Sequence, residues 1–432
     1  MKVLTGQLLD YASDPRHAGD GAIRHVVDGA IVIGGDGRII WSGERSDLPS
    51  AHAALERIDY GSKLVLPGFI DAHLHFPQYR MLAAYGKDLL DWLNRYTFIE
   101  EQRYGERGIA ETAAKAFLDE LLRNGITSCL AFSTIHPVAL DCLFEEASRR
   151  NMALASGKTL MDCNAPDGLL DTAQSAYDDS TALIARWHGK GRLKYAISPR
   201  FAVTSTEAQL DAAGRLAKEN PGLLIQTHLS ENPAEIEFVA GQFPWSKDYT
   251  DVYDRYGLLT PSSLFAHGIH LSERELARLS EAGSAVVHCP TSNNFLGSGL
   301  FRLHRTSEGD HPVNVGVGCD IGGGMSYSMF DTLRDAFTVS QLVGSRISAH
   351  EAFYRATLGN ARLLGTDGEV GTLDAGKYAD LVVIDPCATP LMAERHALSG
   401  NLHDVLFALM ILGDDRAVTE TWVAGAPLKP GP

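Results

Sequence analysis

The sequence predicts an α/β protein built on a TIM (β/α)8 barrel, with a small β-sandwich domain formed by the N- and C-terminal segments. Three observations predict this fold. Eight short apolar or β-branched runs recur between residues 64 and 320, helix-length stretches separate them, and strand-like runs also lie at both ends of the 432-residue chain. Eight parallel strands are the number that closes such a barrel. The runs cover residues 64–75, 127–134, 152–160, 193–200, 223–230, 264–270, 285–289 and 313–320.

The stretches between the runs carry helix signals. Apolar residues form a helical stripe over residues 109–121, and Gly125 supplies a stop before the second run. After the sixth run, Ser272 and Glu275 form a capping box, and Gly283 ends the helix that follows. Alternation of runs and helices in this order predicts β-α units and a parallel sheet.

Both ends of the chain remain outside a barrel of about 250 residues or more. Residues 30–40 read as two strands around a Gly/Asp-rich turn, and residues 370–373 and 379–384 again look like strands. We therefore expect the two ends to combine into one small β domain. The expected boundaries are residues 66–365 for the catalytic barrel, and 1–65 with 366–432 for the composite domain.

Composition narrows the classes of partner and compartment. The chain has 38 Lys and Arg against 54 Asp and Glu, so its net charge of −16 would repel nucleic acid and anionic membranes. Six cysteines without a CxxC pair are typical of reduced core residues. Gln7 and Asp10 interrupt any signal sequence, and the longest apolar run, 405–412, is too short for a bilayer of ~30 Å. A cytoplasmic protein is expected.

A metal site is the sharpest prediction from individual residues. His73 and His75 are two positions apart on the first strand, so both imidazoles point to the same side. His228, His267 and Asp320 end later strands, and in this fold the carboxyl ends of all strands face one rim.

We select His73, His75, His228 and Asp320 as ligands, an N3O set that is typical of zinc or another borderline divalent ion with an open position. The alternative for each histidine alone is a core residue that bonds a backbone carbonyl. The fourth strand ends in SPRF at 198–201, without a bridging Lys, Asp or Glu, so one metal is expected.

Glu231 is the candidate for proton transfer. It lies three residues beyond His228, on the loop that leaves the fifth strand, where a carboxyl can move protons between water and a substrate nitrogen. The alternative is a charge that favours the N-terminus of the following helix. Other chemistries fit poorly, because the glycine-rich segment 316–324 matches neither GxGxxG nor a P-loop, and no GxSxG or PCxxC motif is present.

At this point the chain resembles the amidohydrolase superfamily of metal-dependent hydrolases. PGFIDAHLH at 67–75, histidines on the fifth and sixth strands and an aspartate on the eighth carry that resemblance. Within the superfamily, Gln78, LLDWLNRYTF at 89–98, SPRF and HLSEN at 228–232 are similar to the guanine deaminase family. The similarity covers most of the predicted barrel.

The resemblance implies one Zn²⁺ per subunit on the four ligands named above, and hydrolysis of guanine to xanthine and ammonia in purine catabolism. It also implies a homodimer. Zinc would lower the pKa of a bound water to ~7. Asp320 would then accept the water proton, Glu231 would protonate a ring nitrogen, and His267 would orient the nucleophile. The implied substrate-binding residues are Gln78, Arg200, Phe201, His75, Glu231 and Asp320.

Alternatives stay open for the substrate and for some residues. A shared metal site does not determine the substrate, so a deaminase of another purine or of a related heterocycle is the nearest rival. Arg200 has the alternative role of a salt bridge at the barrel rim, and Trp92 is a second candidate for the aromatic wall. A non-catalytic barrel scaffold is the rival of a different class, and it predicts a damaged metal set.

Overall fold

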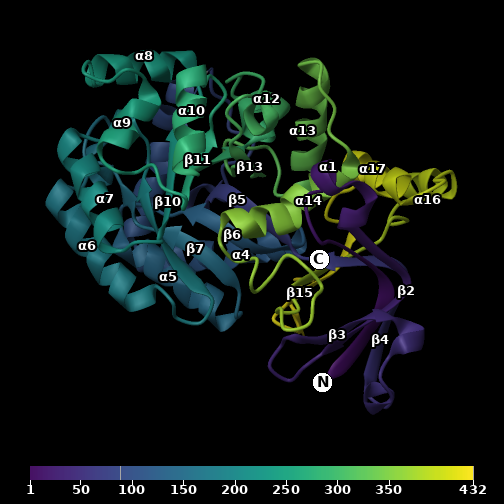
Figure 1. Ribbon diagram of the computed structural model, residues 1–432. Coiled ribbons are helices and arrows are strands. Elements are labelled where there is room, and N and C mark those ends of the chain that lie inside the picture. Colours follow the sequence, from purple (N-terminus) through teal and green to yellow (C-terminus); the bar gives the residue numbers. More distant parts are fainter. Residues whose placement is uncertain (88, 432) are drawn as a thin grey trace.

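The computed structural model describes residues 1–87 and 89–431. It contains two β assemblies, a ring of parallel strands wrapped by helices and a mixed sheet made by the two ends of the chain (Figure 1). The ring forms the larger teal and green body, whereas the purple and yellow ends of the chain meet beside it. The predicted α/β barrel with a small β domain from both termini is confirmed.

The ring contains eight parallel strands that follow one another in chain order. Backbone hydrogen bonds close it, because Asp320 N donates to His73 O at 3.0 Å and His75 N donates to Ile321 O at 2.7 Å. A short strand, β8 (Thr159–Leu160), pairs with the end of the fourth ring strand. The ring strands are β5 (Phe69–His75), β6 (Ile126–Phe132), β7 (Ala153–Gly157), β9 (Leu193–Pro199), β10 (Leu224–Leu229), β11 (Ser263–His267), β12 (Ala285–His288) and β13 (Asn314–Val317).

The first predicted run divides between the two assemblies. Residues 64–66 belong to β4 (Glu56–Pro67) of the terminal sheet, and the first barrel strand begins only at Phe69. Gly68 makes this crossing possible, because a Cβ at that position would lie 2.2 Å from Thr127 Oγ1 on the neighbouring strand. At this connection between the two assemblies, the backbone of residue 68 therefore lies too close to the neighbouring strand for any side chain.

Helices cover the outside of the ring, with the predicted signals at their ends. In α10 the Ser272–Glu275 capping box is present and Gly283 caps the helix at φ 68°. Gly125 follows α4 at φ 78°. The helices of eight or more residues in and around the barrel are α4 (Arg107–Arg123), α5 (Pro137–Arg149), α6 (Ala173–Trp187), α7 (Glu207–Glu219), α8 (Pro233–Gln242), α10 (Glu273–Ala282) and α13 (Met329–Leu342). Shorter helices include α2 (Leu89–Trp92), α3 (Phe98–Glu101), α9 (Tyr249–Arg255), α11 (Pro290–Phe295), α12 (Leu303–Glu308), α14 (Ala349–Tyr354) and α15 (Asn360–Leu363).

The terminal sheet joins both ends of the chain in one seven-stranded order, β16-β15-β14-β4-β1-β2-β3. Its core contains Leu4, Leu8, Val65, Leu381 and Trp422, which are buried together. The domain boundaries at 65/66 and 365/366 stay predictions. The remaining strands of this sheet are β1 (Lys2–Tyr11), β2 (Ile23–Ile33), β3 (Ile39–Glu44), β14 (Leu381–Ile384), β15 (Val418–Val423) and β16 (Ala426–Pro427).

One predicted strand is wrong. Residues 370–373 form turns and irregular backbone, whereas β14 occupies the later part of the 379–384 run. Gly371 has φ 89°, and the backbone N–H of Leu373 donates to the buried Asp10 carboxylate at 2.6 Å. This N–H group thus forms its hydrogen bond with a side chain and not with a neighbouring strand.

Two helices after β14 pack back onto the barrel helices. They are α16 (Pro390–Ala397) and α17 (Leu402–Leu412), drawn in yellow in Figure 1. Phe407 of α17 meets Phe337 of α13 edge to face, with 5.1 Å between ring centroids. The apolar run 405–412 thus lies in a helix beside the barrel. Among the described residues, no helix combines the length and the apolar character needed to cross a membrane.

A buried ion pair links the barrel to the terminal sheet. Arg192, just before β9, donates from Nη1 and Nη2 to the two oxygens of Asp380, at 2.9 and 2.5 Å. Both side chains are at most 2% exposed. The pair lies at the amino end of the barrel strands, on the opposite side from the residues described next.

Candidate active site

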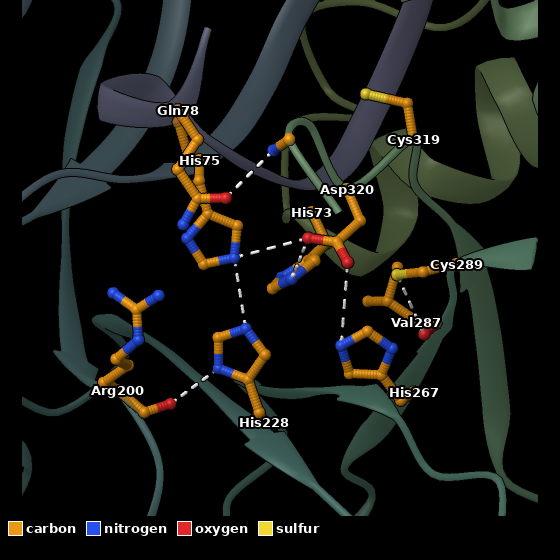
Figure 2. Close-up of polar contacts among 12 residues, drawn as sticks. His73, His75, Gln78, Arg200, His228, His267, Val287, Cys289, Cys319 and Asp320 are labelled. Atoms are coloured by element: carbon orange, nitrogen blue, oxygen red, sulfur yellow. Dashed lines mark hydrogen bonds and ion pairs between the residues drawn. The ribbon is translucent and has the colours of Figure 1, made fainter. Parts of the chain in front are cut away.

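The predicted site residues converge at the carboxyl rim of the barrel (Figure 2). His73 and His75 lie at the end of β5, His228 on β10 and His267 at the end of β11, and Asp320 follows β13. All five side chains are buried. The ends of four strands therefore bring four imidazoles and one carboxylate together.

The four predicted ligands have the spacing of a coordination shell. Nε2 of His75 lies 3.1 Å from Nε2 of His228, and Oδ1 of Asp320 lies 3.3 Å from Nε2 of both His73 and His75. Ligand atoms at about 2.0–2.2 Å from a tetrahedral metal are ~3.3–3.6 Å apart, so the observed distances fit one small divalent ion. Nε2 of His73 is buried and has no hydrogen-bond partner among the described residues, as expected of an atom kept for a metal.

Neighbouring groups orient two of the rings. The Arg200 carbonyl accepts a hydrogen bond from Nδ1 of His228 at 2.6 Å, which directs the Nε2 lone pair of His228 into the cluster. Asn293 Oδ1 accepts from Nδ1 of His267 at 2.8 Å. These partners select the tautomer that metal ligation or proton transfer at Nε2 requires.

Electrostatics favour neutral imidazoles around an ionised carboxylate. Burial lowers the pKa of His75 to about 3, and burial with the neighbouring histidines also lowers the pKa of His228 well below its usual value. Burial alone would raise the pKa of Asp320, but the close His73 and His75 rings outweigh it and hold this pKa well below the usual range. These charges suit the N3O donor set that the sequence predicts, and the ligand set stays a prediction.

Three residues at or just beyond strand ends near the cluster have a left-handed backbone conformation. Ser230, His267 and Asp320 have φ of 48°, 70° and 51°, a region that residues other than glycine rarely adopt. Such strain persists where the surrounding structure dictates it, and it concentrates at functional sites. Here it turns the chain sharply at the ends of β10, β11 and β13 and brings His267 and Asp320 to the cluster.

Glu231 lies beside the cluster in a form suited to donate a proton. Its Oε1 accepts from Ser298 Oγ at 2.8 Å, and its Oε2 lies 3.4 Å from Nε2 of His267. Burial and the Asp320 carboxylate raise the pKa of Glu231 to about 8. The helix that follows begins at Pro233 and is capped by Asn232 with Glu235, so Glu231 stands outside it. The alternative role as a helix-terminal charge does not describe this position.

A small cavity opens onto the cluster. Polar groups of Gln78, Arg200 and Glu231 line it together with His75, His228, His267 and Asp320, and apolar walls come from Phe201, Trp92, Leu89, Leu93 and Leu296. Pockets that combine an apolar wall with a few convergent polar groups are typical of small-molecule sites. Every residue that the sequence proposes for substrate binding contributes to this lining.

Several buried residues that support the site are not predicted from the sequence. Glu101 is 0% exposed and bonds both Gln78 and Arg200, so the salt bridge that is the alternative role of Arg200 is present. Ser298 holds Glu231, and Asp71 holds the backbone next to His73. For Glu101 the available signal is a pair of adjacent glutamates, 100 and 101, which does not show which one is buried.

The family follows from comparison of this chain with known proteins. The model of the amidohydrolase family matches residues 64–428. The chain belongs to the amidohydrolase family. That match spans the whole barrel with its metal-type cluster and the C-terminal part of the terminal sheet, so the amidohydrolase assignment covers every site residue described above.

Individual relatives of this amidohydrolase are guanine deaminases. It is 48% identical to the guanine deaminase of Escherichia coli (strain K12) over 385 residues, which is 89% of this chain and 87% of that protein. The solved structure of E. coli guanine deaminase matches with a TM-score of 0.95 at 46% identity and covers 99% of both chains. A guanine deaminase structure from C. acetobutylicum with bound guanine in the active site matches with a TM-score of 0.88 at 30% identity, again over 99% of both chains.

Proposed function

We propose that this amidohydrolase is a guanine deaminase, which uses water to convert guanine to xanthine and ammonia. The observation that carries the proposal is one pocket lined by residues of the His/Asp cluster, by the Glu231 carboxyl and by two polar clamps, Gln78 and Arg200. High identity to guanine deaminases over most of the chain supports the choice of base.

His73, His75, His228 and Asp320 would hold one divalent ion, and zinc suits three imidazoles with one carboxylate. A zinc ion bound there supplies Lewis-acid activation of water near neutral pH. The two oxygens of Asp320 have separate surroundings, since Oδ1 faces His73 and His75 whereas Oδ2 lies 3.8 Å from Nε2 of His267.

Proton transfer falls to Asp320, Glu231 and His267. Oδ2 of Asp320 is placed to accept the proton of the attacking water, and His267 lies between Asp320 and Glu231, where it orients the nucleophile. Burial and the Asp320 carboxylate raise the pKa of Glu231 to about 8, which favours a carboxyl that can protonate a purine ring nitrogen. The resulting Glu231 carboxylate then takes the proton of the newly added hydroxyl and passes it to the departing amine as the carbonyl forms, and the proton held by Asp320 restores the Glu231 carboxyl.

Arg200 and Gln78 bind the base, and rings flank it. The guanidinium is a donor only, so it recognises an acceptor such as the purine carbonyl oxygen. Phe201 and Trp92 line the same cavity and supply aromatic faces for stacking. His75, Glu231 and Asp320 contact the reacting end of the base in this arrangement.

The test is ammonia release, followed with the ultraviolet change of guanine, by the purified protein with and without a chelator. Adenine, cytosine and 8-oxoguanine serve as comparison substrates. We expect guanine to have the highest kcat/KM and the chelator to abolish turnover. A much higher kcat/KM for another base would assign that deaminase activity instead, and metal-loaded protein without turnover on any base would favour the scaffold alternative. The homodimer, the cytoplasmic location and the role in purine catabolism stay predictions.

A further inference from the structure

Glu101 is a buried carboxylate that belongs to no step of the mechanism above. It lies at the end of α3 and is 0% exposed. Both residues proposed to clamp the base point at it, since Oε1 accepts from Gln78 Nε2 at 2.8 Å and Nη1 of Arg200 lies 2.9 and 2.7 Å from the two oxygens. Burial of a carboxylate costs free energy of desolvation, so a buried carboxylate is expected only where hydrogen bonds and ion pairs compensate that cost.

The contact with Glu101 determines the orientation of the Gln78 side-chain amide, that is, which side its nitrogen and its oxygen occupy. Its nitrogen faces Glu101, which only accepts, and its oxygen accepts from Gly322 N at 3.0 Å, which only donates (Figure 2 shows this bond). Rotation of the amide by half a turn would put donor against donor and acceptor against acceptor. Glu101 and the loop after Asp320 therefore leave Gln78 with one free N–H and one free lone pair in known directions.

The contact also holds the plane of the Arg200 guanidinium. Nη1 is engaged by Glu101, and the ring of Phe98, on the same helix, lies 5.5 Å from the guanidinium carbon. The other guanidinium nitrogens remain for a ligand in the cavity that Arg200 lines. Arg200 is linked to the metal cluster as well, because its carbonyl orients His228. The Glu101 carboxylate thus holds both Gln78 and Arg200 in fixed positions relative to the His/Asp cluster.

We propose that Glu101 is the positioning residue for base selection, acting through Gln78 and Arg200. This inference rests on the proposed guanine deaminase function. With the clamps held by Glu101, hydrogen-bond donors of Arg200 face the 6-position of a purine. A 6-oxo group accepts from them, whereas the 6-amino group of 2,6-diaminopurine, which keeps the reacting 2-amino group, offers a donor to a donor. Without Glu101 the guanidinium and the amide are free to turn, and this discrimination is lost.

The first experiment compares wild type with Glu101→Gln on guanine and 2,6-diaminopurine. The side-chain amide of Gln at position 101 would place its NH2 group against an N–H donor of Gln78 or Arg200. We expect KM for guanine to rise about 10- to 100-fold with a smaller change in kcat, and the preference for guanine over 2,6-diaminopurine to fall about 10-fold or more. The metal content per chain stays unchanged, because Glu101 makes no hydrogen bond or ion pair with a residue of the cluster among the described residues.

The matched control removes the charge from another buried Arg–carboxylate pair. Asp380→Asn breaks the bidentate pair with Arg192 at the other end of the barrel. We expect it to lower the melting temperature as much as Glu101→Gln does, yet to leave KM and the base preference unchanged. An equal rise of KM in both variants would show that loss of stability, not positioning, causes the effect, and would overturn the proposal.

A double-mutant cycle tests whether Glu101 acts through its partners. In the background of Gln78→Ala or Arg200→Ala, Glu101→Gln should cost less than half as much in kcat/KM as it does alone, on a logarithmic scale. Full additivity would contradict the proposal. Glu101→Asp keeps the charge and should recover most of the base preference, and it supplies the measurement if Glu101→Gln does not fold.

These outcomes separate the two proposals. A wild-type protein without activity on guanine refutes the proposed function itself. An active wild type whose folded, metal-loaded Glu101 variants keep KM and base preference within about twofold refutes only the role of Glu101.

Discussion

Asp71 ties the first barrel strand to the last, because both of its carboxylate oxygens accept from the backbone N–H of Cys319, at 3.3 and 3.2 Å. Oδ1 also accepts from the backbone N–H of His73 at 3.1 Å. Asp71 is completely buried, and burial raises its pKa to about 6. It thereby holds the backbone of one candidate ligand, His73, and the residue just before another, Asp320.

Loss of this carboxylate should weaken metal binding. Asp71→Ala leaves two backbone N–H groups without an acceptor and loosens the positions of His73 and Asp320, so we expect metal affinity to fall about 10- to 100-fold. Competition titration against a chromophoric chelator measures it. Asp10→Ala is the control, because it removes another buried carboxylate that accepts from a backbone N–H, that of Leu373, in the terminal sheet. Unchanged affinity in Asp71→Ala would remove Asp71 from the support of the site.

Replacement of Glu231 should abolish turnover without loss of the fold. Glu231→Gln keeps the size of the side chain and an acceptor for Ser298 but cannot cycle a proton, so kcat should fall about 10²- to 10⁴-fold. Steady-state kinetics and metal analysis on the same preparation provide the measurement. Glu237→Gln makes the same chemical change at an exposed position on α8 and should behave as wild type. Turnover retained in Glu231→Gln would exclude it as the proton donor.

Local patterns explain how much of this site can be predicted from the sequence. His73 and His75 share one side because of the two-residue repeat of a strand, and His228, His267 and Asp320 follow from the rule that parallel strands end at one rim. The structure brings all five together. Capping at Ser272 is equally local and is confirmed. These features depend on spacing along the chain, which the sequence displays directly.

Features that depend on long-range contacts escape prediction. Glu101 is buried only because Gln78 and Arg200, 23 and 99 residues away, meet it from other elements. Residues 370–373 have the apolar character of a strand, but the Asp10 carboxylate takes the Leu373 N–H that a sheet neighbour would need. The division of residues 64–75 between two sheets is likewise a packing effect, dictated by the close approach of Gly68 to Thr127.

Metal removal should destabilise the folded protein as well as inactivate it. An ion that binds the native cluster and not the unfolded chain stabilises the fold by about 2.7 kcal/mol when its free concentration is 100 times Kd. We expect dialysis against a chelator to lower the melting temperature and abolish ammonia release, and stoichiometric zinc to restore both. Differential scanning calorimetry and the guanine assay check this on one sample. A chelated protein with unchanged melting temperature and activity would contradict the assignment of the cluster as a metal site.

A pH-dependent contribution to stability is expected from His304 and Glu351, remote from the cluster. Nε2 of His304 lies 3.4 Å from Glu351 Oε1, and this hydrogen bond raises the pKa of His304 although partial burial opposes it. Because the folded-state pKa lies above the unfolded value of about 6.5, the stabilisation is fully present below that value and is lost as pH rises through the folded-state pKa. His304→Ala should therefore lower the melting temperature most near pH 5.5, and the difference from wild type should shrink toward pH 8.5. Thermal melts of both proteins across this range measure it, with His17→Ala as an exposed control, and a difference independent of pH would exclude the ionic contribution.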